Sequence, residues 1–238
     1  MRQTGRPVGA KYGFVVDGFY QSQEEVDDPN NARRTGKTPI PGDFKYKDLN
    51  GDGVIDDYDK QIIGNDKPLG TFGLNLGFSY KGFEVSAFFQ GVYNRDISLR
   101  DATNYGAFGG VEYGYTGAFR AGRDGYAQAY DFIMNRWTPE TASTALFPRL
   151  TTNSDYNDTD NSFWIKSGNY IRLKNVQVAY TFPDTFSRNY LGGLKIKLFV
   201  TGQNLWTQAA FSLVDPEVMN FTNYPILKGF NTGINIKF

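Results

Sequence analysis

The segment DLNGDGVIDDYD, residues 48–59, has the residue types and spacing of a calcium-binding loop. Its first, third, fifth and twelfth residues carry side-chain oxygens, and its seventh would use the backbone carbonyl. Gly53 stands sixth, where the chain of such a loop turns sharply. Because a hard cation prefers several oxygen ligands, the sequence predicts one calcium site. The expected ligands are Asp48, Asn50, Asp52, Val54 and Asp59.

An alternative to the calcium site stays open. The twelfth residue, Asp59, is shorter than the bidentate Glu of the standard loop, so weak or partial occupancy is expected. Asp and Asn side chains also accept hydrogen bonds from nearby backbone N–H groups, so an Asx-rich turn of this composition folds without metal. The sequence has no second twelve-residue loop of this kind, which argues against a paired regulatory calcium protein.

A second group of candidates combines aromatic rings with amides and carboxylates. The stretch 104–126 is rich in Gly and Tyr, and Asp and Asn side chains recur through the region up to residue 161. Rings stack on sugars while amides and carboxylates hydrogen-bond to hydroxyl groups, so this region resembles a sugar-binding surface. The alternative is that the rings pack the loop against itself. The candidate ligand-binding residues are Tyr113, Tyr115 and Trp137.

Several other kinds of chemistry are excluded or disfavoured by composition. The chain has neither His nor Cys, which excludes histidine-based triads, cysteine–histidine pairs and thiolate or imidazole metal sites within it. Its 25 basic and 25 acidic residues balance, so nothing favours nucleic acid as a partner. No pair of carboxylates stands out as an acid–base couple, so no enzyme activity is expected.

The elements that would position these residues are strands. In Thr71–Asn94, TFGLNLGFSYKGFEVSAFFQGVYN, two alternating runs flank a tight turn at Lys81-Gly82. Each run has about ten residues, the length with which a tilted strand crosses a bilayer. A half-buried hairpin in a soluble sheet also alternates, but the small polar face and the aromatic residues near the turn favour a membrane strand. The first run places Phe72, Leu74, Leu76, Phe78 and Tyr80 on one face and Thr71, Gly73, Asn75, Gly77 and Ser79 on the other.

Three further segments repeat the alternation: 169–182, 194–206 and 230–238. In the first of these, Ile171 and Leu173 have the wrong parity for the apolar face that continues from Val176, so either a bulge or a strand end that extends beyond the bilayer is expected. In the second, Lys195 and Lys197 point away from the apolar face, as suits a watery lumen.

The remaining segments carry weaker signals. Residues 9–21 predict one strand or a short hairpin, and residues 22–41 predict an exposed loop. Residues 60–63 predict one helical turn, residues 126–137 a short helix, and residues 184–193 a turn. Residues 95–168 otherwise lack sustained alternation, and a loop of that length is normal for a membrane barrel.

Several segments together resemble the C-terminal part of the SusC/RagA-type TonB-dependent outer-membrane transporters of Bacteroidetes. The segments are GDFKYKDLNGDGVIDDYDKQIIGN, FFQGVYN, NRWTPE, SFWIKSGNYIRLKNVQVAYTFP, VTGQNLWT, DPEV and the aromatic C-terminus. The resemblance implies an all-β, antiparallel membrane β-barrel of about 22 strands with an N-terminal plug. It also implies import of glycan or peptide fragments powered by TonB, a SusD-like surface lipoprotein as partner, and contact with outer-membrane lipid.

On this resemblance, the whole chain, residues 1–238, is the C-terminal barrel portion, and the plug domain is absent from it. We therefore expect a truncated fragment that does not transport by itself. The expected layout is an extracellular calcium-type loop (42–66), a hairpin (71–94), a long extracellular loop (95–168), a second hairpin (169–206), an extracellular loop (207–229) and a terminal strand (230–238). The alternative is a soluble, calcium-stabilised carbohydrate-binding or dockerin-like module, whose apolar faces would meet in a closed core.

Overall fold

The computed structural model describes residues 5–99, 134–150, 156–157, 159–211, 215–217, 224 and 226–238. These residues form two compact units. Unit 1 takes in residues from 1–67 and 96–167, and unit 2 takes in residues from 68–95, 168–218 and 224–238. The expected all-β, largely antiparallel fold is confirmed, because the described helices are few and short. None of the described helices is long and apolar enough to span a membrane.

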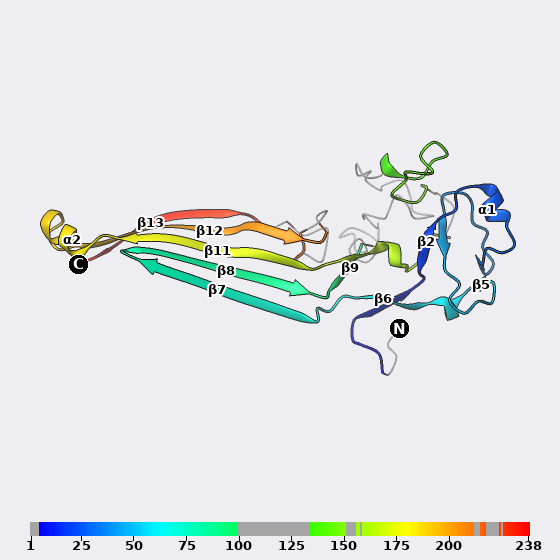
Figure 1. Ribbon diagram of the computed structural model, residues 1–238, viewed down its shortest axis with the longest axis horizontal. Helices are drawn as coiled ribbons and strands as arrows, with labels where there is room; N and C mark the ends of the chain where they lie inside the picture. Colours follow the sequence, from blue (N-terminus) through cyan, green and yellow to red (C-terminus); the bar gives the residue numbers. More distant parts are fainter. Residues whose placement is uncertain are drawn as a thin grey trace, which may run out of the picture. The chain divides into compact units, whose positions relative to one another are not determined.

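Unit 2 is a five-stranded sheet in which every neighbouring pair is antiparallel (Figure 1). The strand order is β13-β12-β11-β8-β7. The strands lie where the alternation predicted them, and they are at least nine residues long. Their bounds are β7 Gly70–Tyr80, β8 Phe83–Tyr93, β11 Tyr170–Thr181, β12 Lys195–Ala209 and β13 Gly229–Lys237.

The turn between β7 and β8 uses the two residues that the sequence indicated. Lys81 has φ 45° and Gly82 has φ 87°, and positive φ at both central residues is the geometry of a type I′ hairpin. A Cβ at Gly82 would lie 2.5 Å from the carbonyl oxygen of Thr181 on β11. Glycine therefore serves both the turn and the close approach of the neighbouring strand.

Of the two explanations for the parity of Ile171 and Leu173, the structure shows the bulge in β11. The register of β11 shifts between Leu173 and Asn175 against both β8 and β12, so Lys174 is the inserted residue. After the shift, Leu173 pairs with Phe89 and Val176 pairs with Ala87, two positions of like parity on β8. The inserted residue thus keeps the apolar face continuous along the strand.

A helix, α2 (Asp184–Tyr190), occupies the segment where a turn was predicted, and that prediction is wrong. Pro183 has extended geometry at the N-cap, which starts the helix, and Gly192 and Gly193 follow its end with positive φ. Three aromatic residues four apart stack along one side of the segment, with ring centroids 5.2 and 5.1 Å apart. These rings belong to Phe182, Phe186 and Tyr190. The helix, the C-terminus and the β7–β8 turn lie at the same end of the sheet (Figure 1).

Unit 1 is built from short strand pairs rather than one sheet. The pairs are β1 (Ala10–Gly13) with β6 (Gln61–Asn65), β2 (Val16–Phe19) with β4 (Phe44–Tyr46), β9 (Asp96–Ser98) with β10 (Ile165–Ser167), and, in parallel, β3 (Arg33–Arg34) with β5 (Val54–Ile55). Among its described residues, unit 1 also contains the short α-helix α1 (Gln23–Asp27) and the 3₁₀ helices η1 (Asp57–Asp59) and η5 (Ser162–Trp164).

Three predictions for unit 1 need correction. Residues 9–21 are neither one strand nor a hairpin, since β1 and β2 pair with different partners. Residues 22–41 contain α1, whose N-cap Ser22 accepts a hydrogen bond from the Glu25 N–H and which buries Val26 completely. Residues 60–63 do not form a helical turn, because the turn lies earlier, in η1, and β6 follows it.

Aromatic rings form the core of unit 1. Phe44 is fully buried, and its ring lies 5.1 Å from that of Phe163, which in turn meets Trp164 edge-on at 4.8 Å. Phe14 and Tyr46 add a further contact at 5.2 Å. Such ring pairs contribute about 0.5–1.5 kcal/mol each beyond their buried area, so they offset the shortness of the strands.

Candidate functional site

The apolar face of the five-stranded sheet is exposed along its length. The structure leaves about half of each central side chain accessible, with Leu74 at 49%, Leu76 at 51% and Val178 at 46%. On β13, Ile234 is 63% exposed. These four residues do not converge on a closed core, which removes the main expectation of the soluble-module alternative. A contiguous apolar surface of this kind marks contact with an apolar environment.

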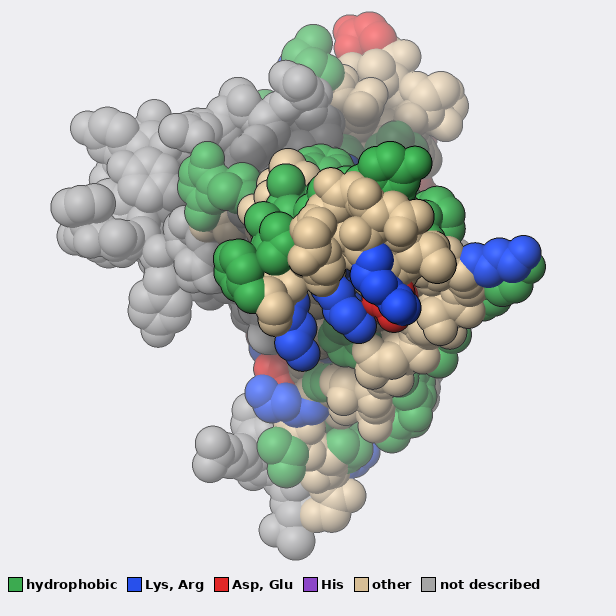
Figure 2. Space-filling model, turned by 90° about the vertical axis from the view of Figure 1, so that its left-hand side faces the viewer, with side chains coloured by type: hydrophobic (Ala, Val, Ile, Leu, Met, Phe, Trp, Pro, Cys, Tyr) green, Lys and Arg blue, Asp and Glu red, His purple; other side chains and the backbone are tan. Residues whose placement is uncertain are grey.

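The opposite face of the sheet is polar and small. On β7 it carries the Thr, Gly, Asn and Ser residues named above, and across the sheet Lys197 of β12 pairs with Glu84 of β8 at 2.6 Å. Lys195 pairs with Asp184 of α2 at 3.2 Å. Figure 2, viewed from the end that carries α2, shows basic side chains grouped around an acidic one, with hydrophobic side chains beside them. The expected direction of Lys195 and Lys197, away from the apolar face, agrees with these pairs.

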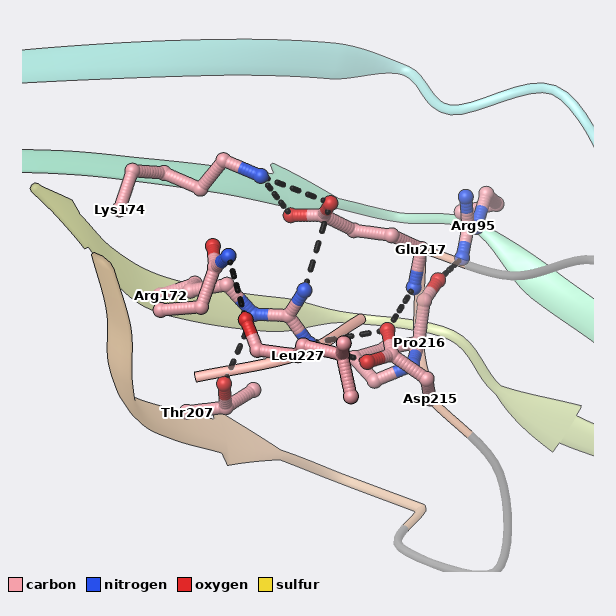
Figure 3. A network of polar contacts seen from close by, with 9 residues as sticks. Arg95, Arg172, Lys174, Thr207, Asp215, Pro216, Glu217 and Leu227 are labelled. Carbon is pink, nitrogen blue, oxygen red and sulfur yellow. Dashed lines mark hydrogen bonds and ion pairs between the residues drawn. The ribbon is translucent and has the colours of Figure 1, made fainter. Parts of the chain in front are cut away.

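A denser charge network lies where β11 and β12 approach the segment 215–217 (Figure 3). The Arg172 guanidinium, only 3% exposed, donates from Nη2 to both carboxylate oxygens of Asp215 at 2.9 Å. Its Nε donates to the Thr207 hydroxyl at 2.8 Å, and its Nη1 lies 3.3 Å from Glu217 Oε2. The Lys174 ammonium donates to Glu217 at 2.9 Å. We call these five residues the arginine cluster.

Backbone contacts reinforce the arginine cluster. The Glu217 N–H donates to Asp215 Oδ1 at 2.9 Å, and the guanidinium of Arg95 donates to the Pro216 carbonyl. The Asn204 amide donates to the Leu227 carbonyl at 3.0 Å, on the other side of the loop. The described part of the loop after β12 is therefore fixed to the sheet at three places. Charge-assisted bonds of this type are shorter and stronger than neutral ones.

Sequence reasoning missed the arginine cluster, although its acidic partners lie in the DPEV segment. Arg172 and Asp215 are 43 residues apart, so no local spacing relates them. The sequence did contain one signal for the direction of the Arg172 side chain, namely the alternation of side chains along β11. Arg172 lies between Ile171 and Leu173, and once a bulge brings those two to the apolar face, Arg172 must point to the polar one.

The calcium-type loop is held together by its own backbone. The two carboxylate oxygens of Asp48 accept from the N–H groups of Gly51 and Gly53 at 2.6 and 2.7 Å. The Gly53 bond is the main cause that lowers the pKa of Asp48, which favours the ionised form. Asn50 Oδ1 accepts from the Asp52 N–H at 3.0 Å, and Asp52 Oδ1 from the Val54 N–H at 2.9 Å.

The twelfth residue of that loop is placed differently. Asp59 is fully buried, and its carboxylate accepts from the N–H groups of Leu49 and Asp56 at 2.8 and 2.9 Å. It thereby closes a capping box at η1 together with Asp56. In the described residues, no group of three or more Asp, Glu, His or Cys side chains is arranged to hold a metal ion. The donor set at the first, third and fifth positions is on one exposed loop, while the twelfth is committed to backbone donors.

Of the aromatic candidates, Trp137 alone lies within the described residues. It is 8% exposed, its indole N–H donates to Gln21 at 3.4 Å, and its ring lies so close to Gly42 that a Cβ there would be 2.5 Å away. The ring is therefore packed, as in the alternative, but against residues outside the loop 95–168 rather than against the loop itself. Tyr113 and Tyr115 lie outside the described residues, so their role stays a prediction.

Comparisons with known proteins identify relatives over nearly the whole chain. The chain is 32% identical over 235 residues to TonB-dependent receptor P26 of Formosa agariphila, which covers 97% of the chain and 21% of that protein. It is 25% identical over 248 residues to TonB-dependent receptor SusC of Bacteroides thetaiotaomicron, covering 96% of the chain and 20% of SusC. No family model matches. The chain thus spans about a fifth of the length of these relatives.

Solved structures agree on the fold. The structure of the RagAB peptide transporter matches with a TM-score of 0.65 and 18% identity, over 96% of this chain and 22% of that one. The same importer in its closed-closed state matches with a TM-score of 0.61 and 19% identity, over 96% of this chain and 23% of that one. At this identity the likeness supports the fold alone.

Proposed function

We propose that this chain, which belongs to the TonB-dependent receptors related to SusC, forms part of the wall of an outer-membrane importer. The observation that carries the proposal is the two-faced sheet. One face exposes a band of large apolar side chains, and the other carries small polar residues and ion pairs. A sheet with these two faces suits a boundary between lipid and an aqueous lumen.

The remaining parts of the proposal follow from the family. The substrates are oligosaccharide or peptide fragments, the surface partner is a SusD-like lipoprotein, and energy comes from TonB acting through the plug of the complete receptor. The end of the sheet with α2, the β7–β8 turn and the C-terminus faces the periplasm. The calcium-type loop (42–66) and the loops 95–168 and 207–229 are then extracellular. This arrangement requires no catalytic step.

We also propose that residues 48–59 hold a single calcium ion. The support is the donor set, since Asp48, Asn50 and Asp52 lie on one exposed loop and Val54 offers a carbonyl. A bound ion would draw these oxygens together and stabilise the loop. The hydrogen bonds already present fit the alternative, in which the turn folds without metal.

One pair of substitutions tests the lipid-facing assignment. Leu76→Lys places a charge in the middle of the exposed apolar face of β7, and Asn75→Lys places the same charge on the opposite face of the same strand. A lysine near the bilayer midplane costs about 2–4 kcal/mol, while a lumen-facing lysine costs little. We expect Leu76→Lys to lower the stability of the protein folded in lipid vesicles, and Asn75→Lys to leave it within about 1 kcal/mol of wild type.

Equal effects of the two lysines would remove the lipid-facing assignment. Import itself is tested by uptake of labelled oligosaccharides and peptides into cells that produce the complete receptor, compared with cells that lack it. Uptake that is unchanged by loss of the receptor, or that does not require TonB, would contradict an energised importer.

A further inference from the structure

A cavity of about 290 Å³ lies within unit 1, and none of its lining residues belongs to the apolar face or to the arginine cluster. It is walled by residues of β1 and β6 and by the start of the segment that runs through η5 into β10. Its size is at the lower end of ligand pockets, which span about 300–1,000 Å³, and so suits one small ring. Its lining includes Lys11, Tyr12, Asp66, Asp160, Asn161 and Trp164.

Two residues that line this cavity each carry a buried polar atom that has no hydrogen-bond partner among the described residues. These atoms are the Tyr12 hydroxyl and Asp66 Oδ1. Buried polar groups nearly always have a partner, and leaving one unmatched costs about 1–3 kcal/mol. The hydroxyl can donate or accept, whereas the carboxylate can only accept. Together they match a ligand group that has both a donor and an acceptor.

The backbone around Asp66 is specifically shaped. Gly9 has φ 87°, and a Cβ there would lie 2.4 Å from Asp66 Oδ1. The Asp66 N–H donates to the Gly9 carbonyl at 3.2 Å, which holds the two segments together. The β1–β6 register also shifts between Lys11 and Tyr12, and bulges commonly redirect a side chain beside a site. Gly9 thus leaves room for the carboxylate next to the cavity.

The charges around the cavity nearly balance. Two aspartates, Asp66 and Asp160, line it, and Lys11 lines it as well. The Lys67 ammonium lies 3.6 Å from Asp66 Oδ1. A cationic ligand would compete with both lysines, and an anionic ligand would meet both carboxylates. A neutral ligand neither competes with the lysines nor is repelled by the carboxylates.

The rest of the wall is rigid and partly apolar. Trp164 is 3% exposed and packs against Phe163 and Phe147, so its position is fixed by the aromatic core. Asn161 is 1% exposed, and its amide caps η5 by accepting from the Phe163 N–H at 3.1 Å. A cavity with fixed apolar walls and a few convergent polar groups is the general form of a small-molecule site.

We propose that this cavity binds one neutral, hydroxyl-rich ring, of the size of a single sugar unit. The Asp66 carboxylate accepts from a ring hydroxyl, and the Tyr12 hydroxyl donates to or accepts from a neighbouring one. The inference deepens the proposed function, on which its role in import rests, by naming neutral sugar as the ligand class. The binding itself is measured without transport.

The test uses the full chain purified in detergent micelles. Saturation-transfer NMR and titration calorimetry measure binding of D-glucose, D-galactose, D-mannose and N-acetyl-D-glucosamine, with methylammonium and acetate as cationic and anionic comparators. We expect at least one sugar to bind and neither ion to do so. Tyr12→Phe and Asp66→Asn should each weaken sugar binding about tenfold, because the first removes one hydrogen bond to the ligand and the second replaces a charged acceptor by a weaker, neutral one.

Matched controls lie elsewhere in unit 1. Tyr58→Phe removes a hydroxyl from a side chain that is 83% exposed, and Asp17→Asn removes a carboxylate that pairs with Lys47 at 3.3 Å near the surface. Both should bind sugar as the wild type does. Thermal unfolding confirms that each variant is folded, and the wild-type titration stands even where a variant does not fold.

Three results would overturn the proposal: no binding of any sugar by the wild type, binding of methylammonium or acetate instead, or sugar binding that Tyr12→Phe and Asp66→Asn leave unchanged. The first would indicate that the cavity holds ordered water only. Failure here is separable from failure of the import proposal. The Leu76 and Asn75 comparison probes unit 2 alone, and neither residue lines the cavity.

Discussion

Replacing Arg172 with Met should be among the most destabilising single changes on the polar face of the sheet. The guanidinium is 3% exposed and makes contacts with Asp215, Glu217 and Thr207 at once. Methionine retains much of the apolar length of the side chain but none of its donors. The substitution therefore leaves two largely buried carboxylates, whose side chains are 13% and 16% exposed, with fewer cationic partners.

The size of the destabilisation depends on the contacts that the two carboxylates keep after Arg172 is replaced. Breaking a buried ion pair by removing one partner costs about 3–5 kcal/mol. Glu217 keeps Lys174 at 2.9 Å, and Asp215 keeps the Glu217 N–H, so the lower end, about 3 kcal/mol, is expected. For a protein of this length, 1 kcal/mol shifts the melting temperature by about 2–4 °C, which predicts a loss of about 6–12 °C.

The control is a second ion pair on the same face. Lys197→Met breaks the Lys197–Glu84 pair, whose side chains are 32% and 46% exposed. An exposed pair contributes about 0–1 kcal/mol, so the melting temperature should fall by less than about 4 °C. Both variants are melted in the same detergent micelles, followed by far-ultraviolet circular dichroism.

A double-mutant cycle separates the pair energy from the cost of truncation. Arg172→Met and Asp215→Ala are measured singly and together, and residues in direct contact show coupling energies of about 0.5–3 kcal/mol. If Arg172→Met costs no more than Lys197→Met, or if the coupling to Asp215 is zero within error, then the arginine cluster does not stabilise the fold and the reasoning is refuted.

Three further predictions test other parts of the structure. If residues 48–59 bind calcium, excess Ca²⁺ should stabilise the protein by about 2.7 kcal/mol at 100 times Kd, and Asp52→Ala should abolish this whereas Asp57→Ala should not. Gly233→Val should cost about 1–3 kcal/mol in unfolding free energy, because its Cβ would lie 2.5 Å from the Phe199 ring. Burial lowers the pKa of Lys166 in the folded protein. Between the folded and the unfolded pKa of this side chain the unfolded state binds more protons, so the melting temperature should rise with pH up to about 10.5. Replacing Lys166 with Met should remove this rise.

Each of these has a defined contrary result. Melting curves that are identical in excess Ca²⁺ and in EDTA would leave the metal-free turn as the account of residues 48–59. A Gly233→Val variant as stable as wild type would mean that the Phe199 ring can move aside without loss. A melting profile between pH 8 and 10.5 that is the same in Lys166→Met and wild type would show that Lys166 does not titrate in a buried setting.

The long strands were predictable because a sheet with one apolar and one polar face requires apolar and polar residues to alternate along each strand. The alternation in residues 71–94 placed β7, β8 and their turn correctly, and the mismatch at Ile171 and Leu173 located a bulge. These signals are local, since each depends on residues within one strand or one turn.

Unit 1 was much less predictable because its structure depends on distant partners. β1 pairs with β6 about fifty residues later, and the strands of unit 1 have two to five residues, too few to show a period. The helix α2 was missed because the first ring of its aromatic stack, Phe182, lies before Pro183, the N-cap residue. The spacing of the aromatic residues therefore does not lie wholly within the helix. Contacts of this kind are decided by packing rather than by local pattern.

The bulge at Lys174 links the two faces of the sheet. With unbroken alternation from Val176 back to Tyr170, Ile171 and Leu173 would face the polar side, and Arg172 would face the exposed apolar side. The single inserted residue reverses the direction of all three side chains, so the apolar band extends to the start of β11 and the Arg172 guanidinium meets Asp215. Lys174 itself then reaches Glu217. One extra residue thus allows the same strand to extend the apolar surface and to fix the loop after β12 on the polar face.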